Sequence, residues 1–409
     1  MSKRRLSSSS ATTPPPSKSP PKATSLPYPS TALPHTARPV PFQQPTGLLT
    51  FSYNPQRALE LTDSALRYYI DPPPNADLKY GYDRWIKRPE EKTRLDGLLR
   101  AIDCVMQKTD TNMGAGCGRQ WLHDIAVVTW RGVMTKILTA PYEERDKCEL
   151  NAMLVNGTLY LEEHTTDAKL IDKENLAPRQ RQQTYYGYSF ESWCTSSSPG
   201  VPERIQGQPV GWGGDVDTNV QWCSVVKTKL GDNRLVIGGE VDCVRDRFKG
   251  QTDTFVELKT SMSIRGPEDE ARFEKKMLRF YMQSFLLGVP EVVVGFRTPA
   301  GRLTTTQSFK TVQLPRLVRG KPHGWDPQIC LYWGQQFISS LRSQIAATLQ
   351  VENQADGGGM RRVWRVTLSP REGATVRLLD DVGVQEVVSG DDRVGFMPAW
   401  FFDKVNTPV

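Results

Sequence analysis

The chain of 409 residues has no long apolar run, and charged residues occur throughout it. A helix needs roughly 20 consecutive apolar residues to cross a bilayer, and no segment approaches that length. The first residues, MSKRRLSSSS, lack the apolar core of a secretory signal. Hydrophobic residues make up 38% of the chain, which is enough for a sizeable core. We therefore expect a soluble, intracellular protein.

The residues that usually bind zinc are sparse. Only four histidines occur, and they are scattered. The seven cysteines are odd in number and form no C-x-x-C pair, so we expect reduced thiols. A zinc site or a histidine-based catalytic triad therefore has little support, and any metal chemistry in this chain must depend on carboxylates.

Acidic residues are absent from residues 1–45, which carry six lysines and arginines and eleven of the 30 prolines. These six charges account for most of the net charge of +7, so the overall charge does not by itself argue for nucleic-acid binding. We predict a disordered Pro/Ser-rich basic tail over 1–45 and a single domain over 46–409. Lys3, Arg4 and Arg5 are either a weak nuclear import signal or solubilising charge.

Four charged side chains occur in pairs between Arg234 and Ser261. Glu240 and Asp242 are two residues apart, as are Glu257 and Lys259. Side chains alternate along a strand, so the members of each pair share a face. If the two strands meet, three carboxylates and one ammonium come together. Such a set suits a hard divalent cation, Mg²⁺ or Mn²⁺.

The segment Arg245–Asp253 contains Gly250 and is long enough to turn the chain, so we expect the two strands to pair antiparallel. The alternative is an ordinary hairpin with charges on its solvated face. However, the acids follow apolar segments, Val236–Gly239 and Phe255–Val256. A carboxylate cluster beside such segments is costly unless a cation compensates it.

Other charged residues follow or lie within predicted elements. Arg131 follows the predicted strand Asp124–Trp130 and serves either as an anion ligand or as a surface ion-pair partner. Glu191 lies in Gln183–Trp193, an alternating segment that predicts a strand with Gly187 and Ser189 on the face of the acid.

Helices are predicted over Ala58–Tyr69, Lys92–Cys104, a short segment after Gly132, Gly266–Gly288 and Asp326–Leu349. Gln283 lies at the edge of the apolar stripe of the fourth of these and either reaches into a site or is exposed. Strands are predicted over Asn151–Glu162, which turns at Asn156-Gly157, and over Val220–Leu230, Glu291–Arg297, Leu303–Phe309, Val363–Leu368 and Ala374–Leu379.

The charged motifs, taken in chain order, resemble those of the DXO/Rai family of RNA 5′-end decapping enzymes. The marks of that family are an arginine, G-φ-x-φ-E, E-φ-D and E-φ-K, where φ is apolar. They correspond to Arg131, Gly187–Glu191, Glu240–Asp242 and Glu257–Lys259, and the resemblance extends from about Phe51 to Phe402. It implies an α+β fold of twisted mixed β-sheets flanked by helices, with an active-site hairpin related to the PD-(D/E)xK nucleases.

The resemblance also implies a role for each motif residue. Glu191, Asp242 and Glu257, with the main-chain carbonyl of Leu258, would hold a divalent metal, and Glu240 would bind a second ion or a metal-bound water. Lys259 would position that water and help to deprotonate it. Arg131 and Gln283 would contact the 5′ nucleotide and its phosphates. Two positions for Mg²⁺ or Mn²⁺ are thus expected.

The implied activity is hydrolysis at RNA 5′ ends: release of NAD from NAD-capped RNA, of the cap dinucleotide from incompletely capped RNA, and of pyrophosphate from 5′-triphosphate RNA. A Rai-type member would also bind and stimulate a nuclear 5′→3′ exoribonuclease, which predicts a nuclear location. Two alternatives remain. The chain could be a mainly non-catalytic scaffold for that exoribonuclease, or a DNA nuclease of the PD-(D/E)xK kind.

Overall fold

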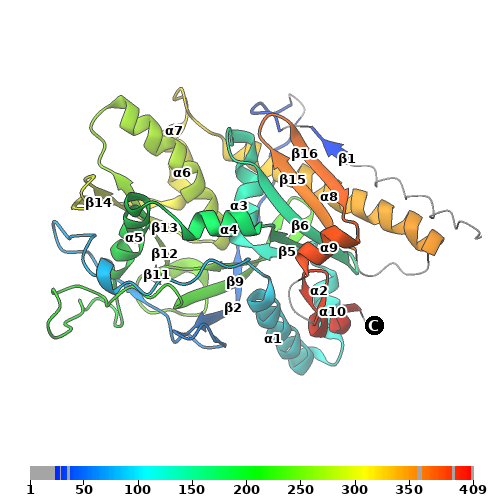
Figure 1. Ribbon diagram of the computed structural model, residues 1–409, viewed down its shortest axis with the longest axis horizontal. Helices are drawn as coiled ribbons and strands as arrows, with labels where there is room; N and C mark the ends of the chain where they lie inside the picture. The colour runs from blue at the N-terminus through cyan, green and yellow to red at the C-terminus, as the bar shows by residue number, and fades with distance from the viewer. Residues whose placement is uncertain (1–23, 28, 35–36, 357–361, 389–391, 407–409) are drawn as a thin grey trace, which may run out of the picture.

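A computed structural model describes residues 24–27, 29–34, 37–356, 362–388 and 392–406. Two large β-sheets lie side by side, and helices cover their faces (Figure 1). The α+β class with twisted mixed sheets is confirmed. Within the described ranges, no helix is both long and apolar enough to span a membrane.

The larger sheet has ten strands and is mixed, because its central strand β5 pairs in parallel with both of its neighbours. The strands in spatial order are β1 (Thr24–Leu26), β16 (Gly373–Leu378), β15 (Trp364–Ser369), β6 (Cys148–Val155), β7 (Thr158–Glu163), β5 (Val127–Trp130), β10 (Asn233–Glu240), β9 (Gln221–Leu230), β2 (Thr46–Tyr53) and β3 (Leu59–Glu60).

The smaller sheet has six strands, of which β12 and β13 are parallel. Their spatial order is β14 (Leu303–Lys310), β13 (Glu291–Arg297), β12 (Phe255–Met262), β11 (Cys243–Val244), β4 (Tyr68–Tyr69) and β8 (Thr195–Ser196). A short ribbon of β17 (Arg393–Val394) and β18 (Met397–Pro398) lies near the C-terminus.

Ten α-helices occur in the described part of the chain. They are α1 (Asp96–Met113), α2 (Cys117–His123), α3 (Arg131–Thr139), α4 (Asp167–Glu174), α5 (Pro178–Trp193), α6 (Pro267–Leu287), α7 (Leu314–Val318), α8 (Pro327–Asp356), α9 (Asp381–Val387) and α10 (Ala399–Asn406).

Strand β10 shows how the larger sheet is covered on both faces. Its Leu235 and Ile237 pack with α3, α6 and α8, whereas Val236, between them, packs with α1 and the C-terminal segment. This alternation is that of a strand buried on both faces. A third cluster joins α5 to the smaller sheet through Phe190 and Leu258. The two sheets are therefore held together by shared helices.

Ala58–Tyr69 was predicted to be a helix, and this prediction is wrong. Its two ends are the strands β3 and β4, which belong to different sheets. The Ser52 side chain also accepts the N–H of Ala65 at 3.0 Å, which fixes the segment against β2. Tertiary pairing overrides the helical spacing here, because a short isolated helix is marginal on its own.

Gln183–Trp193 was predicted to be a strand, and the structure corrects this to the helix α5. Tyr186, Phe190 and Trp193 are buried at spacings of four and three residues, which is a helical stripe. Pro178 at the first position favours helix initiation. Tyrosines on both faces of α5 produced the alternating pattern.

The predicted hairpin across Arg245–Asp253 is also corrected. Strands β10 and β12 lie in different sheets, and only β11 pairs antiparallel with β12, through Cys243↔Val256 and Val244↔Phe255. The chain passes from one sheet to the other at Val241 and Asp242. The antiparallel pairing is thus confirmed for the short β11–β12 hairpin, which places Asp242 beside β12, whereas Glu240 is brought there by the junction of the sheets.

The remaining predicted elements are confirmed, with shifts at their ends. The turn at Asn156-Gly157 joins β6 to β7, and α6 ends at Gly288, whose φ is 71°. The predicted tail lies mostly outside the described residues. Within it, Thr24–Leu26 pairs with β16 and Val40 is buried in the core.

Candidate active site

Seven of the eight predicted site residues come from five separate places at the junction of the two sheets. Glu240 ends β10, and Asp242 follows in the connection to β11. Glu257, Leu258 and Lys259 lie on β12. Two helix ends complete the set: Arg131 begins α3, and Glu191 lies in the last turn of α5.

Glycines in β10 allow Arg131 to reach this junction. A Cβ atom on Gly239 would lie 3.0 Å from Cβ of Arg131, and one on Gly238 would lie 2.8 Å from the Trp130 ring. Real Cβ atoms rarely approach so closely, so β10 needs these two glycines where Trp130 and Arg131 cross it. The sequence Gly-Gly before Glu240 thus has a steric cause.

A similar contact places Glu191. The Phe190 ring packs on Gly295 of β13, where an added Cβ would lie 2.4 Å from a ring carbon. This contact fixes the last turn of α5 against the smaller sheet. The C-terminal end of a helix carries partial negative charge, so a carboxylate at Glu191 is unfavourable unless a cation is near.

Glu257 is held between two cations. Its side chain is fully buried; Oε2 accepts a hydrogen bond from Arg131 Nη1 at 2.7 Å, and Oε1 lies 2.5 Å from Lys259 Nζ. Burial raises the pKa of Glu257, but Arg131 and Lys259 outweigh it and hold this pKa at about 2. Glu257 is therefore ionised throughout the neutral range.

The other acids are less well compensated. Burial first, and then the charge of Glu257, raise the pKa of Asp242 to about 7, although its Oδ2 accepts the main-chain N–H of Leu258 at 2.6 Å. Burial, Asp242 and Glu240 together raise the pKa of Glu191 well above its ordinary value. These directions indicate an excess of negative charge at the junction.

Glu240 is oriented by a residue that the sequence did not point to. Gln221 donates its amide N–H to Glu240 Oε2 at 2.8 Å, while its Oε1 accepts from Arg57 at 2.5 Å and from Arg88 at 3.1 Å. Because arginine can only donate, the two guanidinium groups fix which way the Gln221 amide points. No motif marks Gln221, since its role depends on contacts between β9, β10 and two connecting segments far apart in the sequence.

A cavity of about 480 Å³ opens onto the acidic residues. Glu191, Glu240 and Asp242 line one part of it, and Trp85 and Tyr188 line another. The Trp85 and Tyr188 rings lie 5.8 Å apart. The cavity thus offers carboxylates beside aromatic surface, which suits a nucleotide.

Gln283 does not join this cluster. It lines a second cavity of about 300 Å³ together with Gly132 and Arg279. None of the hydrogen bonds in the described ranges joins Gln283 to the acids. Gly132, which follows Arg131 directly, is the residue of this second cavity that adjoins the site in sequence.

The donor set fits a divalent cation by its chemistry. Four carboxylates are hard oxygen ligands, and the raised pKa values of Glu191 and Asp242 mark charge that a cation would neutralise. As arranged, however, no group of three or more His, Cys, Asp or Glu side chains in the described residues could hold a metal ion. The oxygens of Glu257, Glu240 and Asp242 are turned toward Arg131, Lys259, Gln221 and the Leu258 amide, so metal binding requires these side chains to exchange partners.

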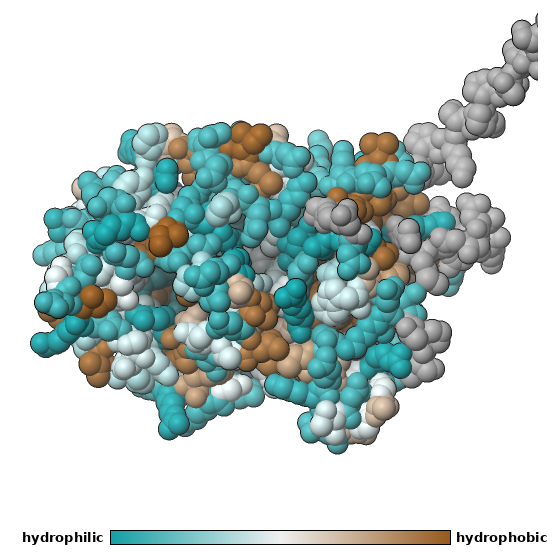
Figure 2. Space-filling model, turned by 60° about the horizontal axis from the view of Figure 1, so that its bottom comes forward, coloured by the Kyte–Doolittle hydropathy of each residue, from teal (hydrophilic) through white to brown (hydrophobic). Residues whose placement is uncertain are grey.

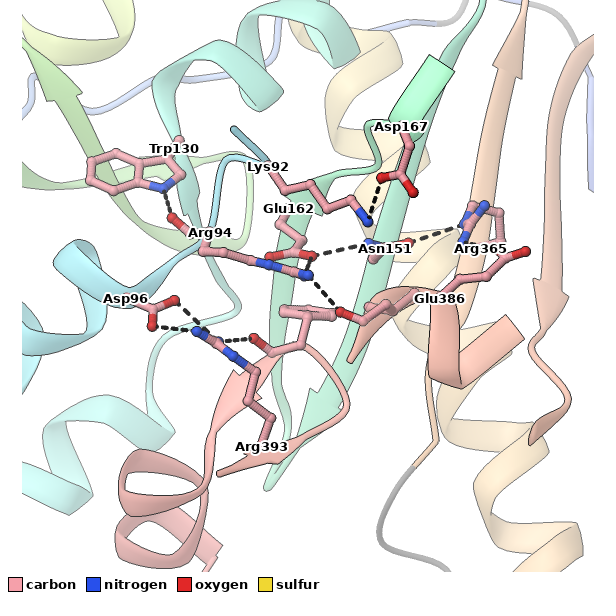
Figure 3. Close-up of polar contacts among 12 residues, drawn as sticks. Lys92, Arg94, Asp96, Trp130, Asn151, Glu162, Asp167, Arg365, Glu386 and Arg393 are labelled. Carbon is pink, nitrogen blue, oxygen red and sulfur yellow. Dashed lines mark hydrogen bonds and ion pairs between the residues drawn. The ribbon is translucent and has the colours of Figure 1, made fainter. Parts of the chain in front are cut away.

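A second buried polar network is centred on Arg94 and Glu162 (Figure 3). Arg94 donates to Glu162 at 2.7 Å and to the carbonyl of Val387 at 2.6 Å, and Asn151 donates to Glu162 at 3.0 Å. The Trp130 indole donates to the Arg94 carbonyl at 2.8 Å. This network ties the C-terminal segment to the residue preceding Arg131.

The model of one protein family, described as RAI1 like PD-(D/E)XK nuclease, matches residues 43–402. The chain belongs to this family. It is 38% identical to the decapping nuclease RAI1 of Mycosarcoma maydis, over 89% of this chain and 88% of that protein. It is also 38% identical to the human decapping and exoribonuclease protein, over 78% and 81% respectively.

Among solved structures, S. pombe Rai1 in complex with 3′-FADP matches with a TM-score of 0.66 and 25% identity. The match covers 88% of this chain and all of that one. Membership of the family predicted from the four motifs is thus confirmed. The structure shows that these site residues lie close together. The role of each residue stays a prediction.

Proposed function

We propose that this protein is a metal-dependent hydrolase of RNA 5′ ends. It would remove NAD caps and incomplete, unmethylated caps, and release pyrophosphate from 5′-triphosphate RNA. The observation that carries the proposal is the convergence of four carboxylates with Arg131 and Lys259 beside a cavity of about 480 Å³, in a chain of the RAI1-like nuclease family.

A bound Mg²⁺ or Mn²⁺ would supply an activated water and neutralise charge on the phosphate oxygens. Glu191, Asp242, Glu257 and the Leu258 carbonyl would hold it, with Glu240 beside a second position. The raised pKa of Lys259, set mainly by Glu257 and Asp242 against the effect of burial, keeps this side chain charged at neutral pH. Lys259 therefore acts as a donor that orients the attacking water, and Glu240 accepts the proton.

Arg131, released in part from Glu257 when that carboxylate turns to the metal, would bind phosphate oxygens. Its pKa is raised by Glu257 and Asp242 in spite of burial, so the guanidinium keeps its charge in the site. Gln283 and Gly132 would contact the 5′ nucleotide from the second cavity. The 3′-FADP bound to S. pombe Rai1 supports a pocket that accepts dinucleotides.

The second part of the proposal concerns partners and location. The resemblance to Rai-type proteins supports binding and stimulation of a nuclear 5′→3′ exoribonuclease, and hence a location in the nucleus. The alternative function is a mainly non-catalytic scaffold that stabilises this exoribonuclease. Retention of all four acids, Lys259 and Arg131 favours an enzyme over a pure scaffold.

The direct test offers NAD-capped, 5′-triphosphate and unmethylated-cap RNA to the protein with Mg²⁺, Mn²⁺ or EDTA. We expect NAD, pyrophosphate and the cap dinucleotide as products, detected by mass spectrometry, and none of them in EDTA. Asp242→Asn should lose all three activities. Asp232→Asn, at a carboxylate 98% exposed, should keep them. If none of the three RNAs yields a product with either metal, the proposed enzymatic function is wrong.

Two further arms separate the alternatives. A 5′-triphosphate DNA of the same sequence should remain intact, and its cleavage would favour a DNA nuclease. Asp242→Asn is then mixed with the 5′→3′ exoribonuclease, and the thermal stability of the latter is measured. Stabilisation equal to that by the wild type would make the scaffold role independent of hydrolysis.

A further inference from the structure

A basic pocket of about 270 Å³ lies where β12 ends and α6 begins. Ser261 and Ser263 line it from the strand and its extension, and Arg265, Arg272 and Lys276 line it from the following loop and helix. In Figure 1 this loop lies at the outer end of α6, at the upper left. Figure 2 shows a face of the molecule on which hydrophilic residues cover most of the surface and hydrophobic ones form small patches.

The pocket has more positive than negative charge. Asp269 is its one lining carboxylate, and its Oδ1 is 2.5 Å from Arg272 Nη2. Across the described part of the chain, neither Arg265 nor Lys276 forms an ion pair with a carboxylate. Two cations therefore remain available to an anion.

A buried arginine adds to this charge. Arg297 of β13 is only 8% exposed, yet among the described residues no carboxylate pairs with it and its Nε has no hydrogen-bond partner. Its Nη1 contacts Sδ of Met262, a pocket residue, at 3.4 Å, and its guanidinium lies 4.8 Å from the centre of the Tyr186 ring. A buried charge without a counter-ion is costly, which an anion bound nearby would relieve.

The cations of this group also affect one another. Burial, and then the charges of Arg297 and Arg272, lower the pKa of Lys276. Like charges held this close repel, and such a group persists in folded proteins chiefly where an anion is to be bound. The pocket and its surplus charge therefore point to the same kind of ligand.

The pocket is in line with the proposed active site. Glu257, Lys259 and Ser261 alternate along β12, so they face the same side of the strand, toward α6. At about 3.3 Å per residue, Ser261 lies about 7 Å beyond Lys259 and Ser263 about 13 Å beyond it. Because α6 covers this face and Ser261 is only 4% exposed, a polymer held at Lys259 would reach the pocket over the surface of the molecule, at a separation of a few nucleotides.

We propose that this pocket binds a backbone phosphate of the single-stranded RNA body, downstream of the bond cleaved at the junction of the sheets. The inference rests on the proposed function, because it takes RNA as the substrate. Arg265 and Lys276 contact the phosphate oxygens, Ser261 offers a hydroxyl donor, and the buried Arg297 adds positive charge. The Ser263 hydroxyl, which lies 2.8 Å from Thr304 Oγ1, would join them by exchanging that partner. Since these groups meet phosphate and no base edge, binding here depends on RNA length and not on its sequence.

The test uses the double variant Arg265→Gln/Lys276→Gln and, as a matched control on the same helix, Lys275→Gln. Lys275 is 55% exposed and does not line the pocket. Affinity for a 5′-monophosphorylated ten-nucleotide oligouridylate is measured by fluorescence anisotropy in EDTA, between 50 and 200 mM salt. Working without metal separates binding from hydrolysis.

We expect the double variant to bind the oligonucleotide several-fold more weakly, with a salt dependence reduced by roughly 0.7 per lost phosphate contact, and Lys275→Gln to bind like the wild type. With metal, the double variant should show a raised KM for long NAD-capped RNA and unchanged kinetics on an NAD-capped dinucleotide. A folding defect in the double variant would instead impair hydrolysis of both the long RNA and the dinucleotide.

Affinity and salt dependence equal to those of the wild type would refute the pocket even if hydrolysis is intact. Conversely, loss of length-dependent binding in the double variant supports the pocket even if no 5′ product is ever found, which would refute only the proposed function. Polyglutamate is added as a competitor. If polyglutamate displaces the RNA from the wild type but not from the double variant, the pocket binds an acidic peptide and the proposal of a phosphate site is wrong.

Discussion

Two buried Arg–Glu pairs with the same 2.7 Å separation behave in opposite ways. Glu257 beside Arg131 and Glu162 beside Arg94 are 0% and 1% exposed. The pKa of Glu257 is held at about 2, whereas burial raises that of Glu162 to about 7 in spite of Arg94. The difference is a second cation in direct contact: Lys259 contacts Glu257, whereas in the described part of the chain the neutral Asn151 amide joins Arg94 at Glu162 and Arg393 acts on it more weakly.

Arg94 alone does not offset the rise in pKa that burial causes at Glu162, whereas Arg131 and Lys259 together more than offset it at Glu257. The site glutamate is therefore ionised at every physiological pH and is available as an anionic ligand. Glu162 can take up a proton near neutrality without affecting the site directly. Its network holds the C-terminal segment in place (Figure 3).

Removing the second cation should have the largest effect. Lys259→Met leaves Glu257 with one partner, as at Glu162, and removes the donor that orients the water. We expect kcat/KM for NAD-capped RNA to fall by about 10²- to 10⁴-fold. Lys229→Met, at a lysine that is 41% exposed, should retain activity. A Lys259→Met enzyme with wild-type kinetics would remove Lys259 from the mechanism.

Removing the single cation of the other pair should affect stability. Arg94→Leu leaves Glu162 buried without a counter-ion and deletes the bond to the Val387 carbonyl. The free energy of unfolding at pH 8 should fall by about 3–5 kcal/mol, as measured by denaturant titration. Arg234→Leu breaks an exposed pair of 3.3 Å and should cost at most about 1 kcal/mol. If Arg94→Leu and Arg234→Leu lower the free energy of unfolding equally, the burial of the Arg94–Glu162 pair does not add to its contribution.

The titration of Glu162 gives a smaller, pH-dependent effect. Its pKa in the folded protein lies above the ordinary value of 4.5, so the folded state binds the proton more tightly than the unfolded state. Stability is therefore highest when Glu162 is protonated and falls as pH rises through about 7. Glu162→Gln cannot ionise, so its stability relative to the wild type should rise by about 2.5 kcal/mol between pH 5 and pH 8.

Denaturant titrations of both proteins at several pH values would check this effect. Glu257→Gln is not a suitable comparison, because it also changes the site. Asp124→Asn, at a carboxylate 60% exposed, serves as the neutral control. A constant difference between Glu162→Gln and the wild type across this range would show that Glu162 stays ionised.

Local patterns predicted elements well where local forces and tertiary packing agree. The turn Asn156-Gly157 requires positive φ at both residues, which these residue types accept, and the structure has 47° and 83° there. Helix α6 is bounded by Pro267 and Gly288 in their usual places. The same reasoning failed at α5, because tyrosines buried on one helix face and half-buried on the other imitate a strand period.

The sequence predicted that most of the site residues lie together, and it did not predict which elements bring them together. Arg131, Glu240, Asp242, Glu257 and Lys259 converge as expected, but they do so across two sheets. Gln221, Arg57 and Arg88 were missed, because their hydrogen bonds join residues distant in sequence. Gln283 was predicted to contact the 5′ nucleotide; it lines a second cavity apart from the acids, and its contact with substrate stays a prediction.

The sequence by itself determined which chemical groups are present: carboxylates in place of histidine or cysteine ligands, a lysine two residues from an acid, and four charged motifs in chain order. These are properties of residue type and spacing along one segment. Only the tertiary structure decided which charges are buried together and how many cations each carboxylate meets. Ionisation in a protein interior depends on such distances, and they arise from contacts between strands and helices that are far apart in the chain.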